Sequence, residues 1–151
     1  TKLNYLKFIS MKKINSRRKS RELVMKSIYR GIMNTFDYAD IKKDILEDPD
    51  YCRCDEEFYN SLIDGIKESY QEIVEDLNNF MDKKKEELNP IELSILVVAY
   101  YELKTRVDIP FKVSINEALE ITKSFGGQES FKFVNGSLDK VAKKYRALEV
   151  N

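Results

Sequence analysis

The sequence predicts an all-α protein, built as a single domain of about six or seven helices. The chain has 151 residues, which is the size of one ordinary domain, and only five glycines and three prolines interrupt it. Apolar residues recur at steps of three and four, whereas the strict alternation that is typical of strands is scarce. A composition of 42% hydrophobic and 34% charged residues indicates a folded globular chain rather than a disordered one.

We expect two parts along the chain. Residues 1–15 should form a flexible N-terminal extension, and residues 16–147 should form the helical domain. The first helix is predicted from about Ser16 to Phe36, because its apolar residues share one face at about 100° per residue. A second stripe of the same helix is basic and carries Lys19, Lys26 and Arg30. The helix is therefore amphipathic, with a positively charged outer side.

Two further helices are predicted in the middle of the chain. A short one covers about Ala39 to Glu47, and an acidic loop with Pro49 and both cysteines follows it. A long one covers about Asp55 to Met81, interrupted at most by Gly65, because apolar residues repeat there with helical spacing. These apolar residues are Phe58, Leu62, Ile66, Tyr70, Ile73, Leu77 and Phe80.

The clearest helix start lies at Asn89, Pro90 and Glu92. Asn is a favoured N-cap, Pro suits the first helical position, and Glu can complete a capping box. The helix that follows, from about Ile91 to Leu103, is apolar on nearly every side, and such a helix must be surrounded by its neighbours. It is too short to span a membrane, so we expect it at the centre of the fold.

Two helices complete the predicted domain. A second capping box, Ser114 with Glu117, should open a helix that ends at Phe125, before Gly126 and Gly127. The last helix should run from about Glu129 to Arg146. Its expected buried stripe consists of Phe131, Val134, Leu138, Val141 and Tyr145.

Positive and negative charges are segregated along the chain. The 26 basic and 26 acidic residues leave no net charge, but residues 12–30 contain eight bases against one acid, and residues 37–60 contain nine acids against three bases. Screening limits the field of each patch to about 8 Å, within which a polyanion can sense it. The basic run is rich in arginine, which binds phosphate through two parallel hydrogen bonds, so we expect RNA or another polyanion there. The alternative is an ordinary solvated face.

Phe133 is the most informative exception to the pattern of the last helix. It lies about 110° from the centre of the buried stripe. Its neighbours on that side are Lys132, Lys140, Lys143 and Lys144. Unpaired bases of single-stranded RNA stack on such rings, while ammonium groups hold the phosphates. The alternative is that the ring packs beneath a loop or against the N-terminal arm.

The composition gives little support to an enzyme. The chain has no histidine, and Cys52 and Cys54 alone cannot complete a zinc site, so we expect two reduced thiols, no metal and no cofactor. The only glycine pair follows a predicted helix, unlike a P-loop or a dinucleotide-binding motif. Neighbouring glutamates on a helix point about 100° apart and cannot easily flank one bond. A binding protein is therefore favoured.

Three blocks of the C-terminal half resemble the NusB family of transcription antitermination factors. These blocks are residues 112–120 (KVSINEALE), residues 123–127 (KSFGG) and residues 132–140 (KFVNGSLDK). Weaker similarity lies in residues 20–29, with SREL and IY, and in residues 92–103, which begin with Glu and end in YEL. The resemblance covers about Ser16 to Lys144.

This resemblance implies a fold of two small helical bundles around a shared core, and a non-enzymatic role in the cytoplasm. That role is to bind single-stranded boxA RNA in nascent ribosomal RNA transcripts, together with the small-subunit ribosomal protein that acts as NusE, in the transcription elongation complex. By matching position, the resemblance implies these RNA-binding residues: Arg17, Arg18, Lys19, Arg21, Tyr29, Phe80, Glu129 and Phe133. Glu86 and Glu92 match positions that face the ribosomal partner.

One departure and two alternatives accompany the resemblance. Where the family commonly has an acidic pair and then Ser-His-Lys-Phe, residues 128–133 read QESFKF, without one carboxylate and without the imidazole. The preferred RNA sequence is expected to differ accordingly. A related helical domain precedes the catalytic part of certain RNA cytosine methyltransferases, but that enzyme would need a further parallel-sheet domain. The other alternative is a homodimeric helical scaffold that hides its basic surface.

Overall fold

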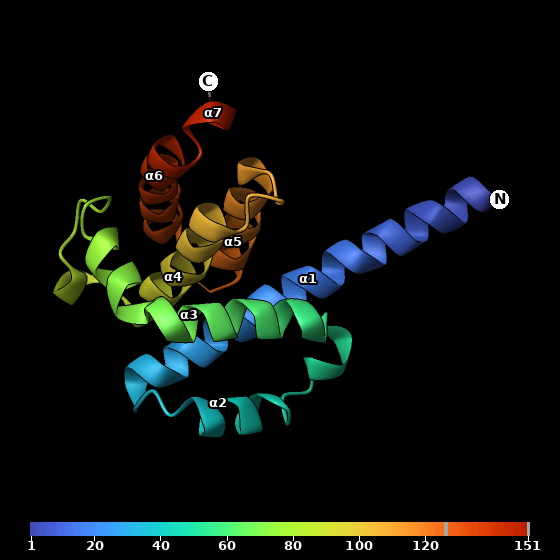
Figure 1. Cartoon of the computed structure of the whole chain (residues 1–151), viewed down its shortest axis with the longest axis horizontal. Helices are drawn as coiled ribbons and strands as arrows, with labels where there is room; N and C mark the ends of the chain where they lie inside the picture. The colour runs from blue at the N-terminus through green and yellow to red at the C-terminus, as the bar shows by residue number, and fades with distance from the viewer. Residues whose placement is uncertain (126, 151) are drawn as a thin grey trace. The chain divides into compact units, whose positions relative to one another are not determined.

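The structure, a computed structural model, describes residues 1–125 and 127–150, and all of their side chains except those of residues 10–15. The described residues form helices joined by short loops and contain no strand, which confirms the all-α prediction (Figure 1). The α-helices are α1 (Lys2–Met33), α2 (Tyr38–Ile45), α3 (Glu56–Leu77), α4 (Pro90–Thr105), α5 (Phe111–Phe125), α6 (Gln128–Tyr145) and α7 (Ala147–Val150). Two short 3-10 helices are η1 (Tyr51–Arg53) and η2 (Lys85–Glu87).

The chain divides into two compact units, Thr1–Ile63 and Asp64–Asn151, with the boundary inside α3. The first unit contains α1, α2, η1 and the first two turns of α3. Its core is built from α1, α2 and α3 and includes Leu23, Val24, Ile28, Ile41, Phe58, Tyr59 and Leu62. The Oγ of Ser27 and the phenolic oxygen of Tyr59 share a buried hydrogen bond of 2.8 Å, which satisfies both groups inside this core.

α1 begins at Lys2, well before the predicted start at Ser16. The side chain of Thr1 caps the helix by accepting a hydrogen bond from the Asn4 N–H at 3.4 Å, and no glycine or proline interrupts the chain before Gly31. The apolar side chains of the first turns, Leu3, Tyr5, Leu6, Phe8 and Ile9, are exposed. The flexibility of residues 1–15 stays a prediction.

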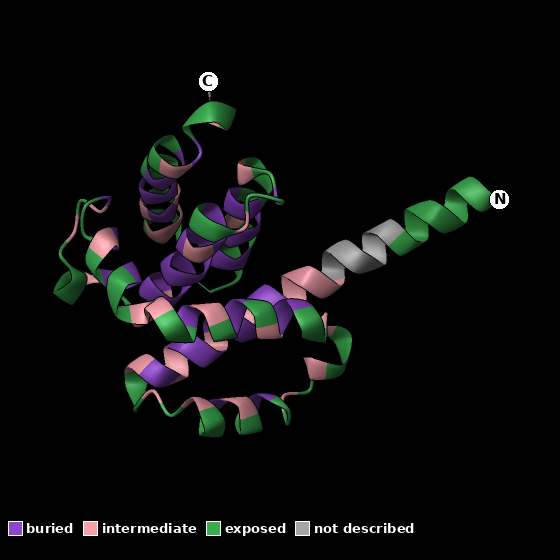
Figure 2. Cartoon of the chain, in the orientation of Figure 1, coloured by how far each residue is buried: buried purple, intermediate pink, exposed green. Residues whose placement is uncertain are grey.

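The second unit is arranged around α4, whose residues are buried on nearly every side (Figure 2). This confirms the central position predicted for the apolar helix. The predicted capping box is also confirmed: the side chain of Asn89 accepts a hydrogen bond from the Ile91 N–H at 2.8 Å, and Glu92 Oε1 accepts one from the Asn89 N–H at 3.2 Å. α3 passes through Gly65 without interruption, and a side chain there would collide with the Tyr101 ring.

The second predicted capping box, Ser114 with Glu117, is wrong. α5 begins at Phe111, directly after Pro110, whose carbonyl accepts the N–H groups of Val113 and Ser114. Proline pre-sets the backbone angle of a first helical turn, so the helix starts earlier than the Ser/Glu spacing predicts. Ser114 is only 1% exposed and its hydroxyl donates to Glu102 inside the unit.

The ends of α3, α5 and α6 lie within a few residues of the predicted positions. α3 ends at Leu77 rather than Met81, because the chain turns there and the Phe80 N–H donates to the Leu77 carbonyl at 2.9 Å. α5 ends at Phe125 as expected, although Gly126 lies outside the described residues. Phe131 and Tyr145, expected on the buried stripe of α6, are half-buried. The residues that α6 buries are Val134, Ser137, Leu138, Val141 and Ala142.

Candidate nucleic-acid interface

In the first unit, the predicted cations lie on the middle of α1 in two different environments. Arg17, Arg18 and Lys19 are half-buried, whereas Arg21 is 4% exposed. The guanidinium groups of Arg17 and Arg21 lie 4.5 Å and 4.9 Å from the centroid of the Phe58 ring, within the range of cation–π attraction. Arg21 is therefore part of the packing of this unit. Arg17, Arg18 and Lys19 are the more accessible charges on this part of α1.

Ion pairs link α1 to the acidic segment, residues 37–55. Lys19 Nζ lies 3.6 Å from a carboxylate oxygen of Asp50, and Lys26 Nζ lies 3.5 Å from one of Asp48. Arg17 pairs with Asp55 at 3.9 Å, and Arg30 pairs with Asp44. The two runs of opposite charge in the sequence thus meet in the folded unit, so the local positive excess is partly offset by acids from its own chain.

This pairing is a feature that the sequence reasoning missed. Along the sequence the basic and acidic runs form separate patches, and only their nearly equal excesses of opposite charge indicate that they could pair. Half-exposed pairs of this kind contribute only about 0–1 kcal/mol each, so they are weak enough for a phosphate to compete with them. Tyr29 also lies on this helix, half-buried and next to Arg30. The side chains of Lys12 and Lys13 lie outside the described residues.

In the second unit, Phe133 is half-buried on α6, away from the residues that this helix buries. The ammonium group of Lys83 lies 4.5 Å from the centroid of its ring. Elsewhere on α6, Lys132, Lys140, Lys143 and Lys144 are exposed, as is Glu129 in the first turn. The ring is therefore only half-buried, as its place on the helical wheel predicts, and one cation lies over it.

Phe80 has a different environment from Phe133. It is 7% exposed, and its ring packs against Tyr145 with a centroid separation of 6.2 Å. Lys144 Nζ lies 5.6 Å from the same ring. This burial favours a supporting position beneath the surface over direct stacking on a base.

Asp76 organises the polar groups beside Phe80. Its carboxylate accepts hydrogen bonds from the hydroxyl groups of Tyr100, at 2.5 Å, and Tyr145. Burial alone would raise the pKa of Asp76, but the hydrogen bonds from Tyr100, Tyr145 and Asn79, together with the charge of Lys144, hold the pKa below its ordinary value. Burial, and then the hydrogen bond to Asp76, raises the pKa of Tyr100. The carboxylate is thus kept charged and the tyrosine neutral.

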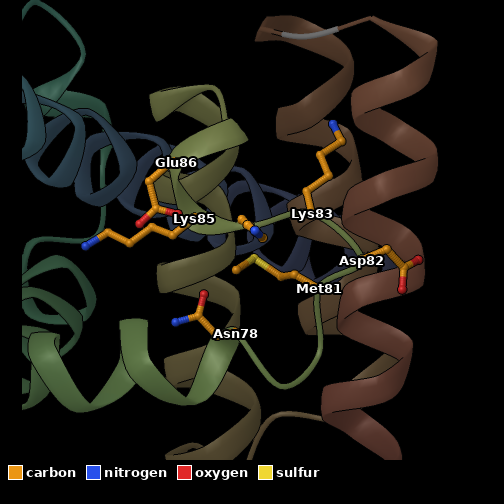
Figure 3. Close-up of a pocket in the computed structure, with 7 residues that line it drawn as sticks. Asn78, Met81, Asp82, Lys83, Lys85 and Glu86 are labelled. Atoms are coloured by element: carbon orange, nitrogen blue, oxygen red, sulfur yellow. The ribbon is translucent and has the colours of Figure 1, made fainter.

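The loop between α3 and α4 forms a pocket of about 370 Å³ (Figure 3). It is lined by Asn78, Met81, Asp82, Lys83, Lys84, Lys85 and Glu86. Asp82 accepts a hydrogen bond from the ammonium group of Lys140 on α6 at 2.9 Å, which ties the loop to that helix. The pocket therefore adjoins Phe133 through Lys83, which belongs to both.

The two predicted partner-binding glutamates differ in accessibility. Glu86 is exposed in η2. Glu92 is 5% exposed, completes the capping box of α4, and has its second carboxylate oxygen 3.9 Å from Lys83 Nζ. A partner protein can reach Glu86 directly, whereas the contacts of Glu92 are internal to the unit.

The predicted site residues fall into two groups. Arg17, Arg18, Lys19, Arg21 and Tyr29 lie in Thr1–Ile63, and Phe80, Glu86, Glu92, Glu129 and Phe133 lie in Asp64–Asn151. Within the part of the chain that the structure describes, no group of three or more acids or cysteines could hold a metal ion. Cys52 and Cys54 are unbridged thiols. No described helix is both long and apolar enough to cross a membrane.

Comparison with known proteins finds similarity over most of the chain. Residues 18–143 match the NusB family. The transcription antitermination protein NusB of Methylobacillus flagellatus is 47% identical over 87% of this chain and 85% of its own length. The corresponding protein of Neisseria meningitidis serogroup A is 40% identical over 87% and 93%. A solved structure of T. maritima NusB superposes with a TM-score of 0.74 at 33% identity, covering 85% of this chain and 92% of the other.

Proposed function

Because the chain belongs to the NusB family, we propose that it acts in transcription antitermination by binding single-stranded boxA-type RNA of nascent ribosomal RNA transcripts. It does so in the cytoplasm as a binding protein rather than an enzyme. The relatives carry the name of transcription antitermination proteins, which supports the role. The observation that carries the RNA assignment is the half-buried Phe133 ring on α6, with the ammonium group of Lys83 over it.

The proposed phosphate contacts lie in the first unit, and the proposed stacking contact lies in the second. The half-buried cations Arg17, Arg18 and Lys19 of α1 bind phosphate groups, since guanidinium and ammonium groups supply the main attraction to a nucleic-acid backbone. Phe133 stacks on one unpaired base, and the ammonium group over its ring then moves to a neighbouring phosphate. Tyr29 and Glu129 lie on the same two helices and contribute polar contacts, while Phe80 supports the surface from beneath.

A second protein completes the proposed function. The acids beside α1 offset part of its positive charge, so unaided RNA binding is weak and a basic partner that adds positive surface tightens it through linkage. The partner is the small-subunit ribosomal protein that acts as NusE, within the elongation complex. Glu86 supplies an exposed carboxylate for it, and Glu92 acts by holding the start of α4.

The salt dependence of RNA binding tests the phosphate contacts. Each contact to single-stranded RNA contributes about 0.7 to the log-log salt slope. Arg18→Gln with Lys19→Gln should therefore flatten the slope by about 1.4, while thermal stability stays nearly unchanged because both residues are half-buried surface cations. Fluorescence anisotropy with a labelled boxA-like RNA at several salt concentrations gives this slope.

The matched control is Lys43→Gln with Lys112→Gln, which removes two exposed positive charges elsewhere. This control should leave the slope close to that of the wild type. Equal slopes for wild type, test variant and control would contradict the assignment of α1 to the phosphate backbone.

A further inference from the structure

Residues 2–9, the arm of α1, expose a contiguous group of apolar side chains. The exposed fractions of Leu3, Tyr5, Leu6, Phe8 and Ile9 lie between 44% and 65%. Figure 2 shows the N-terminal turns of the helix as exposed throughout. A single exposed apolar residue is ordinary in a folded protein, whereas a contiguous group of them marks a surface that binds a partner.

The apolar side chains cover a wide side of the arm. Leu3, Leu6 and Ile9 follow one another at steps of three, which covers about 120° at about 100° per residue, and Tyr5 and Phe8 extend the apolar side by a further 100° or so. Asn4 and Lys7 lie on the remaining polar side. The arm is therefore amphipathic, and its apolar side is broader than its polar side.

The same part of the chain carries positive charge and no negative charge. Residues 1–16 contain Lys2, Lys7, Lys12 and Lys13, and the first acidic residue of the chain is Glu22. Lys2 and Lys7 are exposed. The arm therefore differs from the middle of α1, where carboxylates of the acidic segment pair with the cations.

We propose that the arm binds an anionic lipid surface, lying in its plane as an interfacial helix. The apolar side chains enter the boundary between headgroups and acyl chains, and the lysines stay with the lipid phosphates. Lys2, which falls within the apolar side, reaches the headgroups through its long apolar stem. The inference goes beyond the proposed RNA binding, which uses other residues.

Other occupants match the arm less well. A second copy of the arm would bring lysines against lysines with no acid between them. RNA would attract the lysines but leave Leu3, Leu6 and Ile9 in water. A protein groove accepts a narrower stripe at helical spacing, whereas this apolar side covers more than half of the helix. A fluid anionic surface satisfies both the charge and the broad apolar side.

A single fluorescent reporter tests whether the arm enters lipid. The chain contains no tryptophan, so Phe8→Trp adds the only one. Its emission should shift to shorter wavelength with vesicles of equal parts phosphatidylglycerol and phosphatidylcholine. Half-saturation should need at least about tenfold less lipid than with phosphatidylcholine alone, since each lysine near an anionic surface adds about fivefold in affinity.

The matched reporter control is Met33→Trp, at another exposed apolar position of α1. This control should show no shift with either kind of vesicle. Equal shifts at positions 8 and 33, or no shift at position 8 with the anionic vesicles, would overturn the proposal. A shift of Phe8→Trp in buffer without lipid, together with a doubled mass in light scattering, would assign the arm to a second copy and overturn it as well.

Co-sedimentation with the same anionic vesicles separates apolar contact from net charge. Leu6→Glu with Ile9→Glu should weaken lipid binding at least about tenfold, because two apolar side chains no longer leave water. Met33→Glu with Leu46→Glu adds the same charge at exposed apolar positions outside the arm and should weaken binding much less. RNA affinity of the arm variant should equal that of the wild type. Equal losses of lipid binding in the two variants would contradict insertion of the arm.

Discussion

The Phe133 ring is half-buried, and the ammonium group of Lys83 lies over it. A ring in this position has enough support to keep its orientation and enough exposure to receive a base. A base that stacks there gains the attraction of both the aromatic face and the nearby cation. The residue can therefore contribute to binding far more than to folding.

Truncation of this ring separates the two contributions. Phe133→Ala should weaken RNA binding by about 1–3 kcal/mol, the value of one base–aromatic stack. Its cost to the free energy of unfolding should stay below the roughly 3–5 kcal/mol of a fully buried phenylalanine. Anisotropy gives the first quantity and urea denaturation the second.

Phe131 provides the matched control, because it is also a half-buried phenylalanine of α6 and lies near Lys123 at 5.7 Å. Phe131→Ala should cost similar stability and leave RNA affinity unchanged. Equal losses of RNA affinity in both variants would show that the ring at 133 has no special role.

The charge of the Asp76 carboxylate contributes to stability through its hydrogen bonds. Its folded pKa lies below the unfolded value, so its stabilising effect is complete above the unfolded pKa and is lost as the pH falls through the folded pKa. Asp76→Asn should therefore lower the free energy of unfolding at pH 7 by about 1–3 kcal/mol. The variant should also lose less stability than the wild type between pH 5 and acid pH.

Urea denaturation at several pH values measures this effect. Asp139→Asn, at an exposed position of α6, is the control and should behave like the wild type. Identical pH profiles for Asp76→Asn and the wild type would contradict the role assigned to the tyrosine hydrogen bonds.

Individual residues differ in how far the sequence could predict them. The outer position of Phe133 follows from helical periodicity, which depends only on residues of its own helix. The burial of Arg21 does not, because its guanidinium packs on Phe58 of another helix. The hydrogen bonds of Asp76 likewise join residues from three helices, and no local pattern encodes them.

At the scale of elements, ion pairs join the acidic segment to α1. Asp48 and Asp50 pair with Lys26 and Lys19, so these cations already have anionic neighbours before any RNA arrives. RNA phosphates must then compete with carboxylates of the same chain. We expect this competition to lower RNA affinity without any change in the helices.

Removal of these carboxylate charges should raise RNA affinity. Asp48→Asn with Asp50→Asn releases Lys26 and Lys19, and each released lysine can add up to about fourfold in affinity at 0.15 M salt. The stability cost should stay near 1 kcal/mol or less for each of these partly exposed pairs. Anisotropy and thermal denaturation of the same samples give both values.

The control must remove the same two charges elsewhere. Glu72→Gln with Glu75→Gln does so at exposed positions of α3. If this control raises RNA affinity as much as the test variant, the effect comes from net charge and the competition does not operate.

Elements with strong local signals were predictable, and those that depend on the surrounding chain were less so. The Asn89-Pro90 start of α4 and its all-round burial follow from its own residues. The start of α5 was placed too late, because Pro110 opens the helix and the spacing of Ser114 with Glu117 occurs inside it. The predicted start of α1 is also too late. The prediction relied on a periodic apolar stripe that becomes buried, whereas the first turns of α1 leave their apolar residues exposed.

At the scale of the whole molecule, each unit carries a different part of the proposed RNA site. The first holds the cations of α1 and the second holds Phe133. Composition indicates only a single domain, whereas the family resemblance implies two small helical bundles, and the chain does divide into two compact units. We expect both units to be required for full affinity, since the proposed phosphate contacts lie in one and the proposed stacking residue in the other.

The most direct test of the central claim is RNA binding by the purified protein, alone and with the ribosomal partner. Anisotropy should show weak binding of boxA-like RNA by the protein alone, at least about tenfold tighter binding with the partner, and a preference for boxA-like over scrambled RNA. Glu86→Lys should reduce the gain that the partner provides. Equal affinity for the two RNAs, unchanged by the partner, would contradict the account.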